Sequence, residues 1–174
     1  MYLRRLTLEG FHKKILDGEI VFTEEHTETL YRERIDYELS VINGMGYAEY
    51  YLIVADFIRY AKSVNIPTGP GRGSGAGSIV AYLLGITNLD PLKYDLLFER
   101  FLNPDRISLP DIDVDFDDDG RGRVLNWVTE KYGQEKVAHI ITYGTMATKL
   151  AIKDVARVQK VPLDISNKLC KAIP

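Results

Sequence analysis

The sequence predicts an α/β fold of the α+β kind, in which a small sheet is flanked by several helices. Two observations predict it. Apolar residues recur at three- and four-residue spacing along most of the chain, as they do in amphipathic helices. Two short stretches, residues 107–116 and 137–143, instead carry the apolar runs and the alternation that are typical of strands.

The first third of the chain is predicted to contain a connecting segment and two helices. Residues 1–22 show no clear periodicity and are expected to be irregular. Thr23 is a suitable N-cap for a helix that ends at the glycines of residues 44–46. A second helix is expected over residues 48–64. The apolar stripe of the first helix consists of Leu30, Ile35, Leu39 and Ile42.

The later elements are separated by glycine and proline. A glycine-rich loop, residues 69–78, leads into a helix over residues 79–84. Asp90 and Pro91 are expected to begin a helix that extends to Phe101. The predicted order then continues with the strand 107–116, a helix over 122–132, the strand 137–143, a helix over 145–159 and a last helix from Asp164.

Composition restricts the class of protein. The chain has 174 residues, 45% hydrophobic and 27% charged, which is typical of a folded, soluble domain. The net charge of −3 argues against a general nucleic-acid binder, because such domains are usually basic. The single cysteine, Cys170, excludes an internal disulfide and favours a cytoplasmic location. No apolar run is long enough to span a bilayer, so no membrane partner is expected.

The predicted strand 107–116 carries three carboxylates on one face. Alternate side chains of a strand point the same way, so Asp111, Asp113 and Asp115 are expected to lie side by side. The residues between them point into a core: Ile112, Val114 and Phe116. Three neighbouring anions repel one another, and hard oxygen ligands suit Mg²⁺ or Mn²⁺. The strand therefore predicts a metal site, with a solvated acidic edge strand as the alternative.

The loop 69–78 has the composition of a phosphate-binding loop. Its glycines permit a left-handed backbone and a close approach to a ligand, and it precedes a helix N-terminus. Ser74 offers a hydroxyl donor, and Arg72 adds positive charge. The loop lacks the lysine of a P-loop and a suitable strand before it for a dinucleotide fold. A glycine loop combined with an Asp-x-Asp strand favours a nucleotidyltransferase.

Three stretches resemble one known family, the alpha subunits of bacterial DNA polymerase III, the C-family replicative polymerases. They are residues 69–78 (GPGRGSGAGS), 97–104 (LFERFLNP) and 110–116 (PDIDVDF). Residues 46–57 and 142–158 are similar as well, so the resemblance covers roughly residues 25–174. It implies a DNA-directed DNA polymerase acting on primer–template DNA and deoxynucleoside triphosphates.

The resemblance also implies roles for individual residues. Asp111 and Asp113 would be catalytic and would bind two Mg²⁺ ions, for which Mn²⁺ can substitute, with Asp115 as a further metal ligand. The implied nucleotide-binding residues are Gly73, Ser74 and Arg100, and Arg72 joins these candidates because of the charge it adds to the loop. A surface ion pair is the alternative for Arg100. Lys149 and Lys153 are weaker candidates for phosphate or template contacts, and solvated lysines fit their positions equally well.

The resemblance further implies a domain organisation. Residues 23–174 would be part of a palm domain of the polymerase β-like nucleotidyltransferase type, and residues 1–22 a connection from an N-terminal domain. The family's third catalytic aspartate, its fingers and the parts that contact the sliding clamp and other replisome subunits would lie outside these residues. The isolated chain is therefore predicted not to polymerise DNA at an appreciable rate.

Three other functions remain open. The chain could be another palm-type nucleotidyltransferase with a different acceptor, or a non-catalytic interaction module whose acidic strand binds no metal. A metal-dependent phosphatase or nuclease usually combines histidines with its carboxylates. The chain has three histidines, His12, His26 and His139, and none is close to the carboxylates in sequence.

Overall fold

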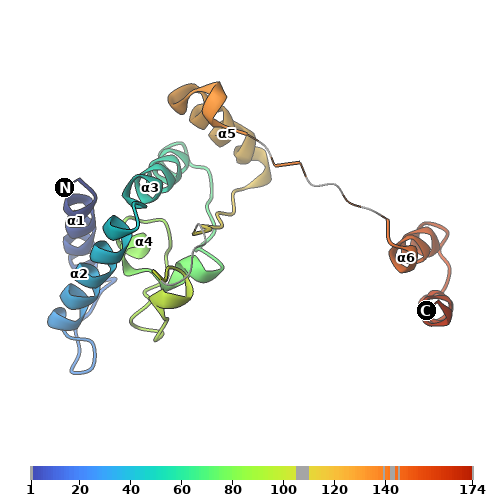
Figure 1. Cartoon of the computed structure of the whole chain (residues 1–174), viewed down its shortest axis with the longest axis horizontal. Helices are drawn as coiled ribbons and strands as arrows, with labels where there is room; N and C mark the ends of the chain where they lie inside the picture. Colours follow the sequence, from blue (N-terminus) through green and yellow to red (C-terminus); the bar gives the residue numbers. More distant parts are fainter. Residues whose placement is uncertain (1, 105–109, 139, 142–143, 145, 174) are drawn as a thin grey trace. The chain divides into compact units, whose positions relative to one another are not determined.

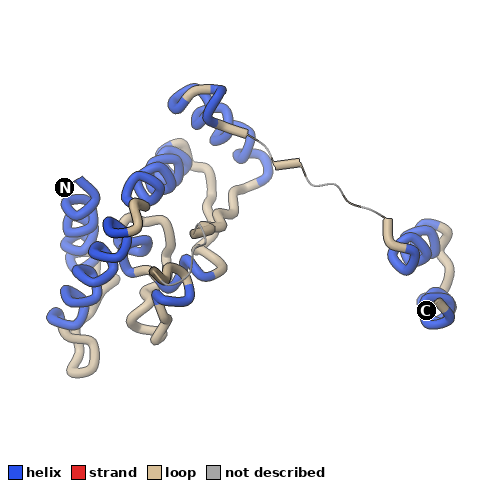
Figure 2. The backbone as a smooth tube through the Cα atoms, in the orientation of Figure 1, coloured by secondary structure: helices blue, strands red, loops and turns tan. Residues whose placement is uncertain are grey.

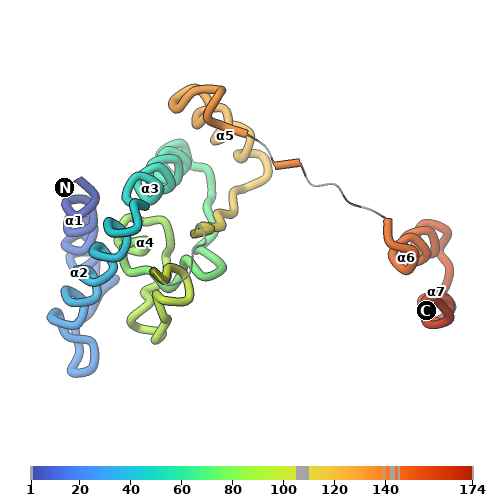
Figure 3. Tube along the Cα trace, viewed as in Figure 1, coloured from blue at the N-terminus to red at the C-terminus, as the bar shows by residue number. Residues whose placement is uncertain are grey.

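The computed structural model describes residues 2–104, 110–138, 140–141, 144 and 146–173 (Figure 1). The chain divides into two compact units, Met1–Val137 and Ala138–Pro174. Figure 3 follows the backbone from the N-terminal helices of the first unit to the two helices of the second.

The predicted α/β fold is wrong for the described part of the chain. Every regular element there is a helix, and Figure 2 shows helices and loops without a strand. Residues 111–115 have no regular secondary structure, and Phe116 forms only an isolated antiparallel bridge with Thr68. Alternation of side chains predicts an extended backbone, whereas a sheet also needs a partner strand along its length. The expected small sheet and palm fold are therefore not supported.

Parts of the two predicted strands fall outside the described residues. Residues 107–109, 139 and 142–143 lie outside the described residues, and so does His139. The described remainder of the second stretch has no strand assignment.

The first unit begins with a helix where an irregular segment was expected. Helix α1 (Tyr2–Leu16) buries Leu3, Thr7 and Phe11, which share one face at four-residue spacing. Thr7 interrupts the apolar pattern, but its hydroxyl donates a hydrogen bond to the Leu3 carbonyl at 3.0 Å. This bond satisfies the buried hydroxyl, so a polar residue can occupy the core-facing stripe.

Helix α2 (Glu28–Gly44) confirms the predicted stripe except for Leu30, which is exposed, and it begins later than predicted. Its N-cap is Thr27, whose hydroxyl accepts from the Leu30 amide at 3.2 Å. Thr23 instead accepts from the His26 amide and closes the turn before the helix. Ile35, Leu39 and Ile42 are buried as expected. Helix α3 (Ala48–Ser63) matches its predicted range closely.

The core of the first unit surrounds helix α4 (Ile79–Leu83), all of whose residues are buried. Helices α1 and α2 both pack against α4. A Cβ atom on Gly10 would collide with the Leu83 carbonyl oxygen, so only glycine permits this approach of α1. The short helix is thus held by the packing around it, because five residues are too few for a stable isolated helix.

The helix expected from Asp90 to Phe101 is also wrong. A turn follows Asp90, whose carboxylate accepts from the Leu92 amide and from the Tyr31 hydroxyl at 2.6 Å. Asp95 then adopts a left-handed backbone, with φ of 50°, which ends the turn. The only helical piece of this stretch is the 3-10 helix η2 (Phe98–Arg100).

Helix α5 (Asp118–Tyr132) packs on α3, and the 3-10 helix η3 (Gln134–Lys136) follows it. Trp127 stacks on Tyr60 with ring centroids 4.4 Å apart. The Asp56 carboxylate on α3 accepts hydrogen bonds from Lys131 and Tyr132 of α5. Aromatic packing and a polar contact therefore join the two helices.

The second unit contains α6 (Thr148–Val158) and α7 (Leu163–Ala172), which pack against each other. Ala156 and the free thiol of Cys170 are buried in this small unit. Across the described parts of both units, no helix combines the length and the apolar character that a membrane crossing requires.

Candidate nucleotide and metal site

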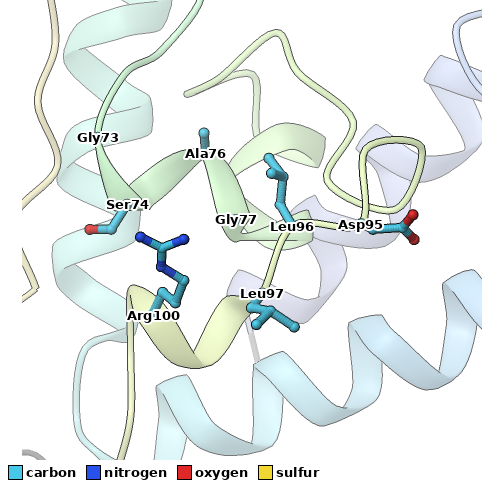
Figure 4. Close-up of a pocket in the computed structure, with 8 residues that line it drawn as sticks. All are labelled: Gly73, Ser74, Ala76, Gly77, Asp95, Leu96, Leu97 and Arg100. Carbon is cyan, nitrogen blue, oxygen red and sulfur yellow. The ribbon is translucent and has the colours of Figure 1, made fainter.

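The glycine-rich loop forms one wall of a cavity. The 3-10 helix η1 (Ser74–Gly77) follows Gly73, whose φ of 67° is left-handed. The cavity of about 500 Å³ is bounded on the other side by the turn before η2 and by η2 itself (Figure 4). Its lining residues are Gly73, Ser74, Ala76, Gly77, Asp95, Leu96, Leu97 and Arg100.

Three of the four predicted nucleotide-binding residues line this cavity, namely Gly73, Ser74 and Arg100. Figure 4 shows the Arg100 side chain extending from η2 toward Ser74, whereas the Asp95 carboxylate points away. Within the described residues Arg100 forms no ion pair, so the alternative of a surface salt bridge finds no support there. The cavity thus presents a hydroxyl and a guanidinium that are available to an anion.

Arg72 has a different environment. Its guanidinium contacts two of the predicted metal-binding carboxylates, with Nε 3.1 Å from Asp115 Oδ2 and Nη2 3.5 Å from Asp113 Oδ1. The three side chains are 40–60% exposed, so these ion pairs are weak and can exchange with other ligands. Asp111 is exposed. No group of three or more metal-binding side chains converges within the described ranges.

The loop and the carboxylate segment touch each other. A Cβ atom on Gly73 would lie 2.9 Å from Asp113 Oδ2, and one on Gly69 would lie 3.1 Å from the Asp115 Cβ. The Gly69 amide also donates to the Asp115 carbonyl at 2.9 Å. Two motifs that are distant in the sequence therefore lie side by side, and their glycines permit the approach.

A buried carboxylate that the sequence analysis missed supports the loop. Glu38 on α2 is fully buried and accepts hydrogen bonds from Arg34, from the Ser78 hydroxyl and from the amides of Ile79 and Val80. Burial raises the pKa of Glu38, and these four donors oppose that rise. The contacts hold the start of α4, which directly follows the loop.

Arg34 extends this support across the cavity. Its Nη2 donates to the Gly77 carbonyl at 3.2 Å and to the Leu96 carbonyl at 3.1 Å. One guanidinium thus joins the loop to the opposite wall. The sequence contained a weak signal for it, since an Arg and a Glu at i and i+4 share a helix face. That spacing normally indicates a solvated pair, so it did not distinguish this one.

Two neighbouring tyrosines on α3 were missed as well. The Tyr50 hydroxyl accepts from the Ile112 amide at 3.0 Å, between two of the predicted metal-binding residues. The Tyr51 hydroxyl lies 3.1 Å from the Ser78 hydroxyl. Aromatic residues in an apolar helix predict packing, and nothing in their spacing indicates these polar contacts.

The lysines named as weaker candidates lie in the second unit. Lys149 and Lys153 are both on α6 and exposed. Their suggested phosphate or template contacts stay predictions.

These motifs occur in a known protein family. The family model described as the bacterial DNA polymerase III alpha NTPase domain matches residues 1–174. The chain belongs to the bacterial DNA polymerase III alpha family. The resemblance noted in the sequence is thereby confirmed.

Individual members of the polymerase III alpha family agree with this assignment. DNA polymerase III subunit alpha of Borreliella burgdorferi is 56% identical over 175 residues, which cover 99% of this chain and 14% of that relative. The Aquifex aeolicus subunit is 53% identical over 173 residues, with 99% and 14% covered. The Deinococcus radiodurans subunit is 61% identical over 141 residues, with 81% and 11% covered. The chain thus spans about one seventh of the length of these curated relatives.

Proposed function

We propose that this chain supplies the nucleotide-binding loop and two catalytic carboxylates, Asp111 and Asp113, of a DNA-directed DNA polymerase. The reaction is template-directed 5′–3′ nucleotidyl transfer, with primer–template DNA and a deoxynucleoside triphosphate as substrates. Membership of the polymerase III alpha family supports the reaction class. The observation that carries the proposal is the close approach of Gly73 to Asp113, because it brings a loop of phosphate-binding composition next to an acidic segment.

The loop binds the triphosphate in this proposal. Gly73 has no side chain at the cavity wall, so a phosphate can approach the backbone amides of η1 closely. Ser74 donates its hydroxyl, and the guanidinium of Arg100 neutralises phosphate charge from the opposite wall. Arg72, a residue of the same loop, can join them when its guanidinium leaves Asp113 and Asp115.

The carboxylates fit divalent metal ions by their chemistry. Asp111, Asp113 and Asp115 offer hard oxygen donors at accessible positions, which suit Mg²⁺ or its substitute Mn²⁺. When bound, such ions neutralise phosphate charge and activate an attacking hydroxyl. Asp111 and Asp113 would hold the two ions, with Asp115 as an additional ligand. Glu38 and Arg34 keep the loop in place while these groups act.

Activity would require more than these 174 residues. The described residues contain no group of three metal-binding side chains, and the relatives are about seven times as long. We therefore expect the chain alone to extend a primer too slowly to measure. Contacts with duplex DNA, the sliding clamp and other replisome subunits would involve the remaining length of the longer protein.

Titration of Mn²⁺ followed by EPR tests the proposal. The wild-type chain is expected to bind Mn²⁺, to bind it more tightly with dATP present, and to lose both effects in Asp111→Asn/Asp113→Asn. Asp118→Asn/Asp119→Asn, in the exposed first turn of α5, is the matched control and should retain both. Wild-type binding that persists unchanged in the Asp111/Asp113 variant would contradict the assignment.

A further inference from the structure

We propose that Tyr50 and Tyr51, neighbours on α3, are positioning residues that each hold a different half of the site. Tyr50 holds the carboxylate segment, residues 111–115, through the Ile112 amide. Tyr51 holds the end of the glycine-rich loop, residues 69–78 (the Gly-Ser loop), through Ser78. This inference rests on the proposed function and adds the element that joins the two halves.

The contact of Tyr50 lies at the centre of the acidic segment. Ile112 stands between Asp111 and Asp113 in the sequence. A hydrogen bond to its amide therefore fixes the backbone next to both carboxylates. Within the described residues, the backbone of 111–115 is held by this hydrogen bond and by the one between Gly69 and Asp115. Without the Tyr50 hydroxyl, the backbone around Ile112 would lose the hydrogen bond that holds it among the described residues.

The environment of Tyr50 keeps its hydroxyl neutral. Burial raises the Tyr50 pKa, the hydrogen bond from the Ile112 amide lowers it, and the charges of Asp111 and Asp113 raise it further. A tyrosine hydroxyl is already protonated at neutral pH, and the net rise in the Tyr50 pKa favours the same form. It therefore brings no negative charge to the carboxylates while it holds their backbone.

The contact of Tyr51 belongs to the buried polar network under the loop. The Ser78 hydroxyl donates its single proton to Glu38 at 2.8 Å and accepts from the Ala81 amide at 3.2 Å. Tyr51, which is fully buried, must therefore be the donor in its 3.1 Å contact with Ser78. Its ring also packs edge-on against Phe101, directly after Arg100.

Helix geometry explains why two adjacent residues serve two motifs. Successive side chains on an α-helix point about 100° apart, so Tyr50 and Tyr51 reach different sides of α3. Between the two motifs, a Cβ atom on Gly75 would lie 3.8 Å from Phe101 and 3.9 Å from Ile112, so the loop packs against both. The position of α3 thus sets the distance between phosphate loop and carboxylates.

The two hydroxyls should be separable in a binding experiment on the whole chain. Tyr50→Phe should weaken Mn²⁺ binding, followed by EPR without nucleotide, by about three- to tenfold, the range expected for one hydrogen bond. It should leave binding of the fluorescent nucleotide mant-dATP in EDTA within about twofold of wild type. Tyr51→Phe should show the reverse pattern, and Ser78→Ala, which removes its partner, should reproduce it.

Tyr132→Phe is the matched control, because its hydroxyl donates to Asp56 and contacts neither the loop nor the carboxylate segment, so it should affect neither probe. Thermal unfolding of each variant is measured alongside, since a merely structural role would weaken both probes together as stability falls. If wild type binds both probes but each tyrosine variant changes both equally, or neither, the inference is overturned and the proposed function stands. If wild type binds neither probe, both are overturned.

Discussion

The Arg72 guanidinium lies 3.1 Å from the Asp115 carboxylate, measured from Nε to Oδ2. A side chain of the Gly-Ser loop is therefore ion-paired with the segment that we propose to bind metal. The same guanidinium contacts Asp113 at 3.5 Å. A divalent cation bound by these carboxylates would compete with Arg72 for the same oxygens, and a bound triphosphate would offer Arg72 an alternative partner.

Replacing this arginine should change metal and nucleotide binding in opposite directions. Arg72→Gln should tighten Mn²⁺ binding in the absence of nucleotide by about two- to fivefold, the range for loss of a competing exposed ion pair. It should weaken binding of mant-dATP, because one cation near the phosphates is lost. Arg32→Gln, whose exposed ion pair with Glu28 lies on α2, should change neither. A decrease in Mn²⁺ affinity of Arg72→Gln would refute the competition.

A methyl group at Gly73 should disturb the site. Gly73→Ala places a Cβ atom 2.9 Å from Asp113 Oδ2 and forces a non-glycine residue into a left-handed backbone. We expect a loss of about 1–2 kcal/mol in the free energy of unfolding, measured with urea, and weaker binding of Mn²⁺. Gly122→Ala, in α5 with nothing near its Cβ position, should instead stabilise the chain by about 0.5–1 kcal/mol. Equal effects of both variants would show that contact with Asp113 is unimportant.

Removing the buried carboxylate of Glu38 should be among the most destabilising single changes. Glu38→Ala leaves Arg34 and three hydrogen-bond donors without their acceptor, which costs about 3–5 kcal/mol for a buried pair. Glu28→Ala, which breaks an exposed pair with Arg32 on the same helix, should cost less than about 1 kcal/mol. Denaturant unfolding of both variants measures the difference. Similar losses would mean that the network contributes little to stability.

The contact between α3 and α5 should produce a defined acid dependence. Burial of Asp56 favours its neutral form, but the hydrogen bonds from Lys131 and Tyr132 and nearby positive charge outweigh this and lower its pKa below 3.8. A lowered pKa in the folded state gives stability that is present above the unfolded pKa and is lost as pH falls through the folded one.

The unfolding free energy of wild type should therefore exceed that of Asp56→Asn by a constant amount at pH 6–7. The difference should shrink as pH falls below about 5 and be lost as pH falls through the folded-state pKa, which lies below 3.8, because Asp56 is then protonated in both states. Urea unfolding at a series of pH values measures it. Asp154→Asn, whose ion pair with Arg157 is local to α6, should not reproduce the pattern. A difference that grows at low pH would contradict the sign of the shift.

Local patterns in the sequence were sufficient for several features of this chain. The apolar stripe of α2, the range of α3 and the glycine loop before α4 depend on residues a few positions apart, and periodicity records such relationships. The family resemblance rested on contiguous motifs in the same way. The sequence also predicted carboxylates on alternate positions of an extended segment, although it did not reveal whether that segment pairs with another strand.

Only the tertiary structure decided which distant groups meet. Glu38 reaches Ser78, Tyr50 reaches Ile112, and Arg72 reaches Asp115 across long stretches of chain. It also decided that residues 2–16 are helical and that no sheet forms in the described part. The physical reason is the same in each case. Hydrogen bonds and burial depend on partners brought together by packing, and local spacing determines which face a side chain occupies but not what lies opposite it.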